Sequence, residues 1–276
     1  MNSKQKVKRT VGEGARVGFI LLAVIAVLFP YMWVILSSFK LPADLTQPTK
    51  FIFSPVIDNW VTVLSGGVSQ NFLTSLLIGL ITIIVSLLVG APAAYSISQY
   101  RTGGRATRFG ILVSQMIPPA VMVVPLFFVA FQLKLNGTIL PVIVAHLTFV
   151  LPVVTWFLIS FFDAVPKELE EAAMIDGCSR FMAFRKIVLP QVLPGIGAAG
   201  IFGFVLSWND MFYALILGGE NTKTLPLAIV GYNTFRGVQL GEMSVAILVA
   251  VIPTLIFSFF VQKKLIKGIG GGGVKG

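Results

Sequence analysis

The residues best placed to do chemistry in this chain form a charged run over 165–190, between two long apolar segments. Carboxylates come first in this run, at Glu168, Glu170, Glu171 and Asp176, and basic side chains follow. Such a pattern suits noncovalent recognition of a partner, so we predict no catalytic residue and no metal site. A charged segment of this length between apolar runs is typical of a surface presented to a soluble protein.

The first half of the run has the features of a short helix. Pro166 suits the first position of a helix, and the glutamates that follow favour the positive end of the helix dipole. Ala172 and Ala173 keep one face small, which lets another backbone approach closely. Asp176-Gly177 then ends the helix, because glycine readily takes the left-handed conformation found there.

The second half predicts another helix. Ser179 can cap it, Phe181 and Phe184 recur on one face, and Pro190 and Pro194 stop it. The alternative is an amphipathic segment lying on the bilayer, but such helices are usually rich in Lys and Arg, and anionic lipid would repel the acidic first helix. We therefore expect a helix-turn-helix element over 163–193 that docks on a protein.

Composition places the rest of the chain in a membrane. Hydrophobic residues make up 56% and charged residues 12%, against about 25% charge in a soluble domain. The apolar runs predict an all-α protein, one transmembrane domain over 1–276, with six spans at about 17–39, 72–95, 107–131, 138–162, 194–217 and 243–262. The formal charge of +10 is spread over segment ends and lacks a nucleic-acid-binding signature.

Basic residues predict the orientation of these spans. With the N-terminus inside, the inner segments carry sixteen Lys and Arg residues and the outer segments five. The positive-inside rule therefore places both termini and the charged run in the cytoplasm.

The charged run also resembles a known signature. Glu171-Ala172-Ala173, Asp176-Gly177 and the later Ile187, Leu189 and Pro190 are similar to the coupling loop of permease subunits in bacterial ABC importers. The resemblance implies that this loop docks on an ATPase subunit. It assigns the docking to Glu170, Glu171, Ala172, Ala173, Asp176, Gly177, Phe184, Leu189 and Pro190.

Three further segments resemble the carbohydrate branch of that family, especially the smaller permease subunit of maltose-type importers. They are Trp208-Asn209-Asp210, Thr224-Leu225-Pro226 and the tail that ends Val274-Lys275-Gly276. The resemblance implies a second permease, two ATPase subunits that hold ATP and Mg²⁺, and an extracellular or periplasmic sugar-binding protein, all at the bacterial inner membrane. It also implies that Val274, Lys275 and Gly276 touch the ATPase subunits; a mobile tail is the alternative.

Polar residues within the predicted spans are candidates for a substrate path. An ionisable group at depth usually faces a cavity or a partner, so Asp210 could line the path, with Trp208 and Tyr213 for stacking and Asn209 for hydroxyl groups. The alternative for Asp210 is a hydrogen bond between helices at the subunit interface, or a position near the outer surface. Gln115 could line a kinked pathway. We interpret His146 as a buried hydrogen-bonding group rather than a proton carrier.

The chain needs a partner or an ion gradient for energy, because no P-loop sequence occurs in it. A secondary transporter is one alternative function, but it would be expected to show internal repeats and paired carboxylates within the spans. A membrane scaffold that does not transport is the other. Co-isolation with an ATPase that responds to a sugar-loaded binding protein would distinguish these functions.

Overall fold

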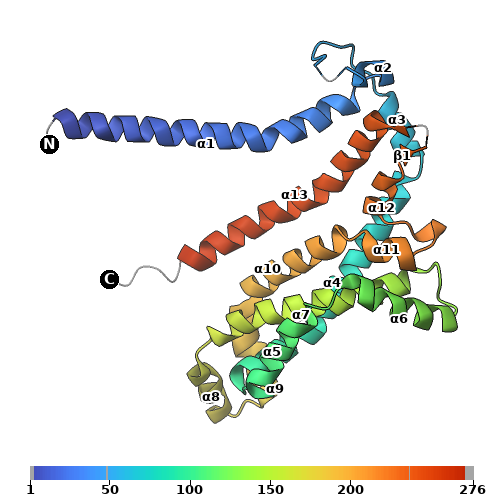
Figure 1. Ribbon diagram of the computed structural model, residues 1–276. Coiled ribbons are helices and arrows are strands. Elements are labelled where there is room, and N and C mark those ends of the chain that lie inside the picture. The colour runs from blue at the N-terminus through green and yellow to red at the C-terminus, as the bar shows by residue number, and fades with distance from the viewer. Residues whose placement is uncertain (1–2, 48, 236, 271–276) are drawn as a thin grey trace. The chain divides into compact units, whose positions relative to one another are not determined.

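The computed structural model describes residues 3–47, 49–235 and 237–270. The chain divides into two compact units, Met1–Gly66 with Gly231–Val249 (unit 1) and Gly67–Val230 with Ala250–Gly276 (unit 2), and each is described by itself. Figure 1 labels the elements of both units.

Unit 1 combines the N-terminal helices with two short strands and the start of the last helix. Its elements are α1 (Ser3–Ser38), α2 (Pro42–Leu45), α3 (Asp58–Ser65), β1 (Asn233–Thr234), β2 (Gly237–Val238) and the first residues of α13 (Leu240–Gly270). The strands pair antiparallel, with Asn233 opposite Val238. Asn59 fastens the end of α1, because its amide nitrogen donates to the carbonyl oxygens of Ser38 at 3.1 Å and Lys40 at 2.9 Å.

Helix α1 has the character of a membrane span. Its apolar stretch Arg16–Ser38 has 23 residues, a length of about 35 Å at 1.5 Å per residue against a hydrocarbon core of about 30 Å. Large apolar side chains from Val17 to Ile35 are exposed around the helix. A helix that is apolar all round suits lipid contact, so α1 is a candidate span at the place of the first predicted one.

Unit 2 contains the remaining elements. They are α4 (Val68–Gln99), α5 (Gly104–Ser114), α6 (Pro119–Gln132), α7 (Ile139–Asp163), α8 (Lys167–Ile175), α9 (Arg180–Ala183), a π turn (η1, Phe184–Val188), α10 (Leu189–Trp208), α11 (Phe212–Leu217), a 3₁₀ turn (η2, Glu220–Thr222), α12 (Leu225–Val230) and the rest of α13.

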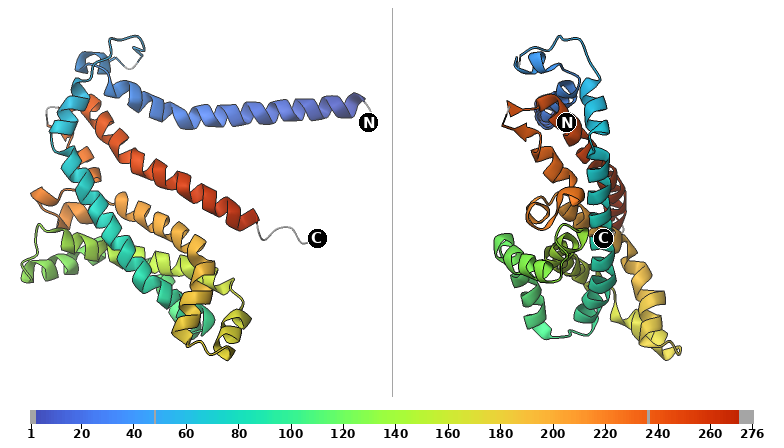
Figure 2. Two further views of the ribbon diagram at one scale, coloured as in Figure 1. Left: turned by 180° about the vertical axis from the view of Figure 1, so that it is seen from behind. Right: turned by 90° about the vertical axis from the view of Figure 1, so that its right-hand side faces the viewer.

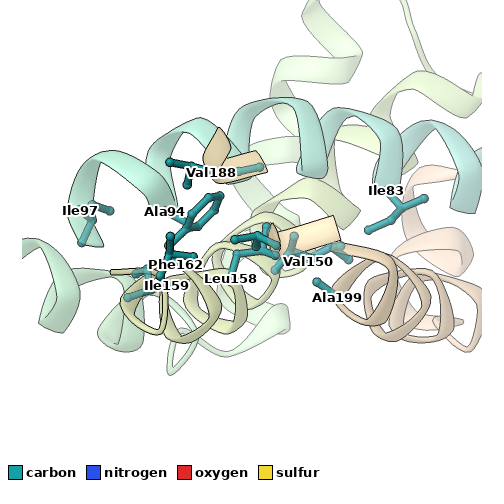
Figure 3. Packing of buried hydrophobic residues seen from close by; sticks show 13 residues of the cluster. Ile83, Ala94, Ile97, Val150, Leu158, Ile159, Phe162, Val188 and Ala199 are labelled. Carbon is teal, nitrogen blue, oxygen red and sulfur yellow. The ribbon is translucent and has the colours of Figure 1, made fainter. Parts of the chain in front are cut away.

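The core of unit 2 lies where α4, α7 and α10 pack together. Figure 3 shows its buried cluster, in which Leu158 and Phe162 of α7 meet Ala94 of α4. Glycine allows α10 to approach closely: a Cβ on Gly203 would lie 2.7 Å from Cδ1 of Ile83 and 2.8 Å from Cγ2 of Val154. Small residues at such contacts are the usual means of packing helices in membranes.

The number of spans agrees with the prediction, with one correction. Within the described residues five helices are long and apolar enough to cross a membrane, and α5 with α6 makes a sixth if the pair is one span. The pair is bent by 86°, so the expected third span, 107–131, is not one continuous helix. Pro118 is extended, with ψ of 135°, and two successive prolines without an N–H break the helical hydrogen bonding.

The predicted end of the second loop helix is wrong. Neither Pro190 nor Pro194 stops it, because Arg180–Trp208 forms a single candidate span of 29 residues. The π turn η1 precedes Pro190, and the N–H of Leu189 donates to the carbonyl oxygen of Phe184. Local π geometry is one way in which helices accommodate proline. This span ends at Trp208 instead of continuing to 217, and α11 begins after a break.

Candidate docking element and polar cluster

The loop element, residues 163–193, comprises α8, α9, η1 and the start of α10. Figures 1 and 2 show α8 and α9 at one end of unit 2. Gly177, between the two helices, has a φ of +89°, so the predicted left-handed conformation is confirmed. The predicted cap is also confirmed, because the Ser179 hydroxyl accepts from the backbone N–H of Met182 at 3.3 Å.

Glu170 fixes α8 to the end of α4. Its side chain is only 5% exposed. Its Oε1 accepts from the hydroxyl of Tyr95 at 2.5 Å and from the hydroxyl of Tyr100. Burial raises the pKa of the Tyr100 phenol, and the hydrogen bond to Glu170 adds to the rise. Glu170 therefore points into unit 2, and its expected place on the docking surface is a correction: the carboxylate holds α8 in position.

Phe184 also faces inward. Its ring lies 4.5 Å from that of Tyr95 and 6.3 Å from that of Phe162, between centroids. Ala173 is buried as well, and Leu189 is half-buried. Phe184 thus packs against α4 and α7, and Ala173 and Leu189 are at least partly covered within unit 2.

The outer side of the loop element carries the other predicted residues. Glu171, Ala172, Asp176, Gly177 and Pro190 are exposed there. Sequence reasoning missed Ile175, which is 85% exposed, and did not assign Phe181, which is 72% exposed, to docking. Large apolar side chains beside the turn at Gly177 were the available signal. Their small, acidic and apolar side chains are groups that a protein partner can contact.

A buried polar cluster joins α7 to the end of α10. Nδ1 of His146 lies 2.6 Å from the hydroxyl of Ser207, and Nε2 lies 3.1 Å from Oδ2 of Asp210. The same Oδ2 accepts from the backbone N–H of Tyr213 at 3.1 Å. The interpretation of His146 as a buried hydrogen-bonding group is confirmed. Asp210 makes its hydrogen bond to α7 of the same chain, whereas the alternative had placed such a bond at the subunit interface.

The remaining predicted path residues do not converge. Trp208 is 2% exposed, and its indole N–H donates to the carbonyl oxygen of Ala250 at 3.1 Å, so it offers no stacking surface. Tyr213 is also buried, against Phe149. Asn209 and Gln115 are exposed at the C-terminal ends of two different helices, α10 and α5. Of the five residues predicted to line a path, only Asn209 and Gln115 are exposed and remain candidates.

The C-terminal residues Val274, Lys275 and Gly276 lie outside the described residues. The expected contact of this tail with ATPase subunits stays a prediction.

Comparison with known proteins identifies the family. Residues 83–271 match the family described as "Binding-protein-dependent transport system inner membrane component". The chain belongs to this family. The predicted resemblance to importer permeases is therefore confirmed, and this inner membrane component is a multi-pass membrane protein with the helices described above.

Relatives of this inner membrane component match over nearly their whole length. The chain is 32% identical to the sulfoquinovosyl glycerol transport system permease protein SmoH of Agrobacterium fabrum, over 96% of the chain and 95% of that protein. It is 32% identical to the trehalose transport system permease protein SugB of Mycobacterium tuberculosis, over 90% and 93%. A subunit of a bacterial ABC transporter involved in alginate import has the same fold, with a TM-score of 0.74, 20% identity and coverage of 95% and 98%.

Proposed function

We propose that this chain is the permease subunit of an ATP-driven importer that moves a sugar or related polyol into the cytoplasm. The exposed loop element, on a member of this family, is the observation that carries the proposal. The carbohydrate class follows from relatives named for trehalose and sulfoquinovosyl glycerol. Neither a secondary transporter nor a scaffold has comparable support.

The importer needs further subunits. A second permease completes the path, two ATPase subunits hold ATP and Mg²⁺, and a binding protein delivers the sugar outside. This permease binds no cofactor itself. In the orientation given by the positive-inside rule, both termini and the loop element lie in the cytoplasm.

The geometry supports a way to couple ATP to transport. Closure of the ATPase dimer moves the docked loop element. Glu170 ties α8 to α4, and α9 continues through η1 into α10, so the movement reaches two spans directly. The bundle then changes from inward-open to outward-open and accepts the sugar. Asn209 and Gln115 remain the candidates for contact with it.

Phe181 provides the test of docking. In the complete transporter, Phe181→Asp places a charge where an apolar side chain is expected to be covered, so the ATPase should be lost on purification. Phe181→Leu is the matched control and should retain it. Sugar-loaded binding protein should stimulate hydrolysis in the wild type and the control only. Normal ATPase retention and stimulation in Phe181→Asp would contradict the proposed docking surface.

A further inference from the structure

A cavity of about 590 Å³ lies in unit 2 where α4 and α7 end and α5 and α8 begin. Its walls carry mainly polar and basic side chains. The lining residues are Ser98, Gln99, Arg101, Gly104, Arg105, Arg108, Asp163, Val165 and Lys167.

The charge of this cavity favours an anion. Arg108 is already paired, because its guanidinium contacts both carboxylate oxygens of Asp163 at 2.8 and 3.1 Å. Across the described part of the chain, Arg101, Arg105 and Lys167 have no carboxylate within ion-pair distance. Three uncompensated cations around one cavity suit a phosphate, which accepts several charge-assisted hydrogen bonds.

The backbone brings these cations together. Arg101 has a φ of +53°, a conformation that is uncommon outside glycine, and Gly103 and Gly104 follow with φ of +70° and +61°. The turn that they form directs the N-terminus of α5 to the cavity wall. That helix has no acidic residue in its first turn, so the positive end of its dipole adds to the attraction for an anion.

Gln99 adds an unpaired acceptor to the wall. Its Nε2 donates to the carbonyl oxygens of Phe162 at 2.7 Å and Val165 at 3.3 Å, which fixes the orientation of the amide. Its buried Oε1 has no partner among the described residues. A buried acceptor without a donor is unfavourable. A ligand that carries a hydroxyl beside its phosphate can supply the donor, once the wall adjusts to admit it.

An exposed apolar stripe continues from the cavity along α5. Arg105 is followed on one helix face by Phe109 and Leu112, at spacings of four and three residues, and Met116 lies in the turn just after the helix. Phe109 is 67% exposed and Met116 is 78% exposed. Because α4 and α7 are spans that end at the cavity, this stripe lies where acyl chains are available, and the cations lie at headgroup level.

We propose that this cavity binds the phosphate headgroup of an anionic membrane phospholipid, with its acyl chains along the exposed face of α5. Arg101, Arg105 and Lys167 bind the phosphate. A basic pocket between helix ends on the cytoplasmic side is a recognised form of lipid site. An acidic side chain of an ATPase subunit could form ion pairs with the three cations, but it would make no contact with the apolar stripe.

The test measures lipid retained by the complete transporter. The transporter is reconstituted in phosphatidylcholine vesicles with and without phosphatidylglycerol, extracted in mild detergent, and analysed by native mass spectrometry. The variant Arg101→Gln/Arg105→Gln removes two cations at the site. Lys134→Gln/Lys223→Gln removes two cations elsewhere in unit 2 and serves as the control. Soluble glycerol phosphate is added as a competitor that lacks acyl chains.

We expect the wild type and the control to retain phosphatidylglycerol in preference to phosphatidylcholine. The site variant should bind it about thirty-fold less tightly, since each cation near a membrane surface contributes about 1 kcal/mol. Equal retention in the site variant and control would overturn the proposal. So would displacement by glycerol phosphate at equal concentration, which would indicate a soluble phosphate. Loss of the ATPase subunit with lipid retention unchanged would assign the cations to that subunit instead.

Discussion

Removing the carboxylate of Glu170 should loosen α8 without disrupting the spans. Two tyrosine hydroxyls donate to Oε1 of Glu170, and they also lie 3.0 Å from each other. Glu170→Leu removes both bonds to the carboxylate, but the two hydroxyls can still pair. A hydrogen bond to a charged group contributes about 1.5–3 kcal/mol. The lower figure for both bonds gives about 3 kcal/mol, and the hydroxyl pair recovers about 1 kcal/mol. We therefore expect a net loss of about 2 kcal/mol, which is about thirty-fold in the opening equilibrium of α8.

Hydrogen–deuterium exchange in the assembled transporter measures that opening directly. Amides of α8 should exchange about thirty-fold faster in Glu170→Leu, and Glu170→Gln, which keeps an acceptor, should lie between. The ATP hydrolysed per sugar imported should rise, because a loosened α8 transmits less movement to α4.

Glu168→Leu is the matched control, since it removes an exposed carboxylate from the first turn of the same helix. Its loss is confined to the helix dipole interaction, about 0.3–1 kcal/mol. Equal exchange in Glu168→Leu and Glu170→Leu would refute the role given to the hydrogen bonds.

Four further predictions test the turn, the pH response, the core and the topology. Gly177→Val should destabilise the turn by about 1–2 kcal/mol and reduce ATPase coupling, because Gly177 has a φ of +89°. An added Cβ would meet no other atom, so the strain would lie in the backbone alone. Sugar-stimulated ATP hydrolysis measures the loss of coupling. Raising the pH above about 10, the usual pKa of a phenol, should destabilise α8. The pKa of Tyr100 is raised in the folded state, so deprotonation at high pH favours the open state. Tyr100→Phe should reduce the dependence of α8 amide exchange on pH. Gly203→Val should lower the thermal midpoint through overpacking of about 1–3 kcal/mol, with unchanged melting arguing against the tight contact. In a cysteine-free background, cysteine at Ser65 should react with an impermeant thiol reagent from outside and cysteine at Thr102 should not; the reverse labelling would overturn the orientation.

Features set by local sequence could be predicted. Gly177 and Ser179 follow from residue type, because a left-handed turn and a helix cap depend on only a few neighbouring residues. The long apolar runs predicted the spans because lipid demands helices of about that length. The two prolines, Pro118 and Pro119, also indicated a bend, but the prediction of a kink underestimated its angle, which is 86°.

The inward or outward direction of each loop residue could not be predicted. The hydroxyl partners of Glu170 lie 70 and 75 residues earlier in the chain, so nothing near Glu170 indicates that it is buried. Trp208 presents the same difficulty, because its acceptor is the carbonyl oxygen of Ala250, 42 residues later. Helical spacing groups residues on a face, but the face that meets the core depends on helices brought together by the fold.

Glu170 and Glu171 show why the side of a helix matters more than the charge of a residue. Successive residues of an α-helix differ by about 100°, so neighbouring carboxylates can have different roles. Glu170 is buried and holds α8, whereas Glu171 is exposed and free to meet a partner. The proposed docking function therefore needs both sides of the loop element. An outer face that docks would transmit no force if the inner face were loose, and a fixed inner face would have no effect without a partner on the outer one. In the proposed mechanism, coupling depends on the stiffness of α8 between the inner contacts of Glu170 and the outer contacts with the ATPase.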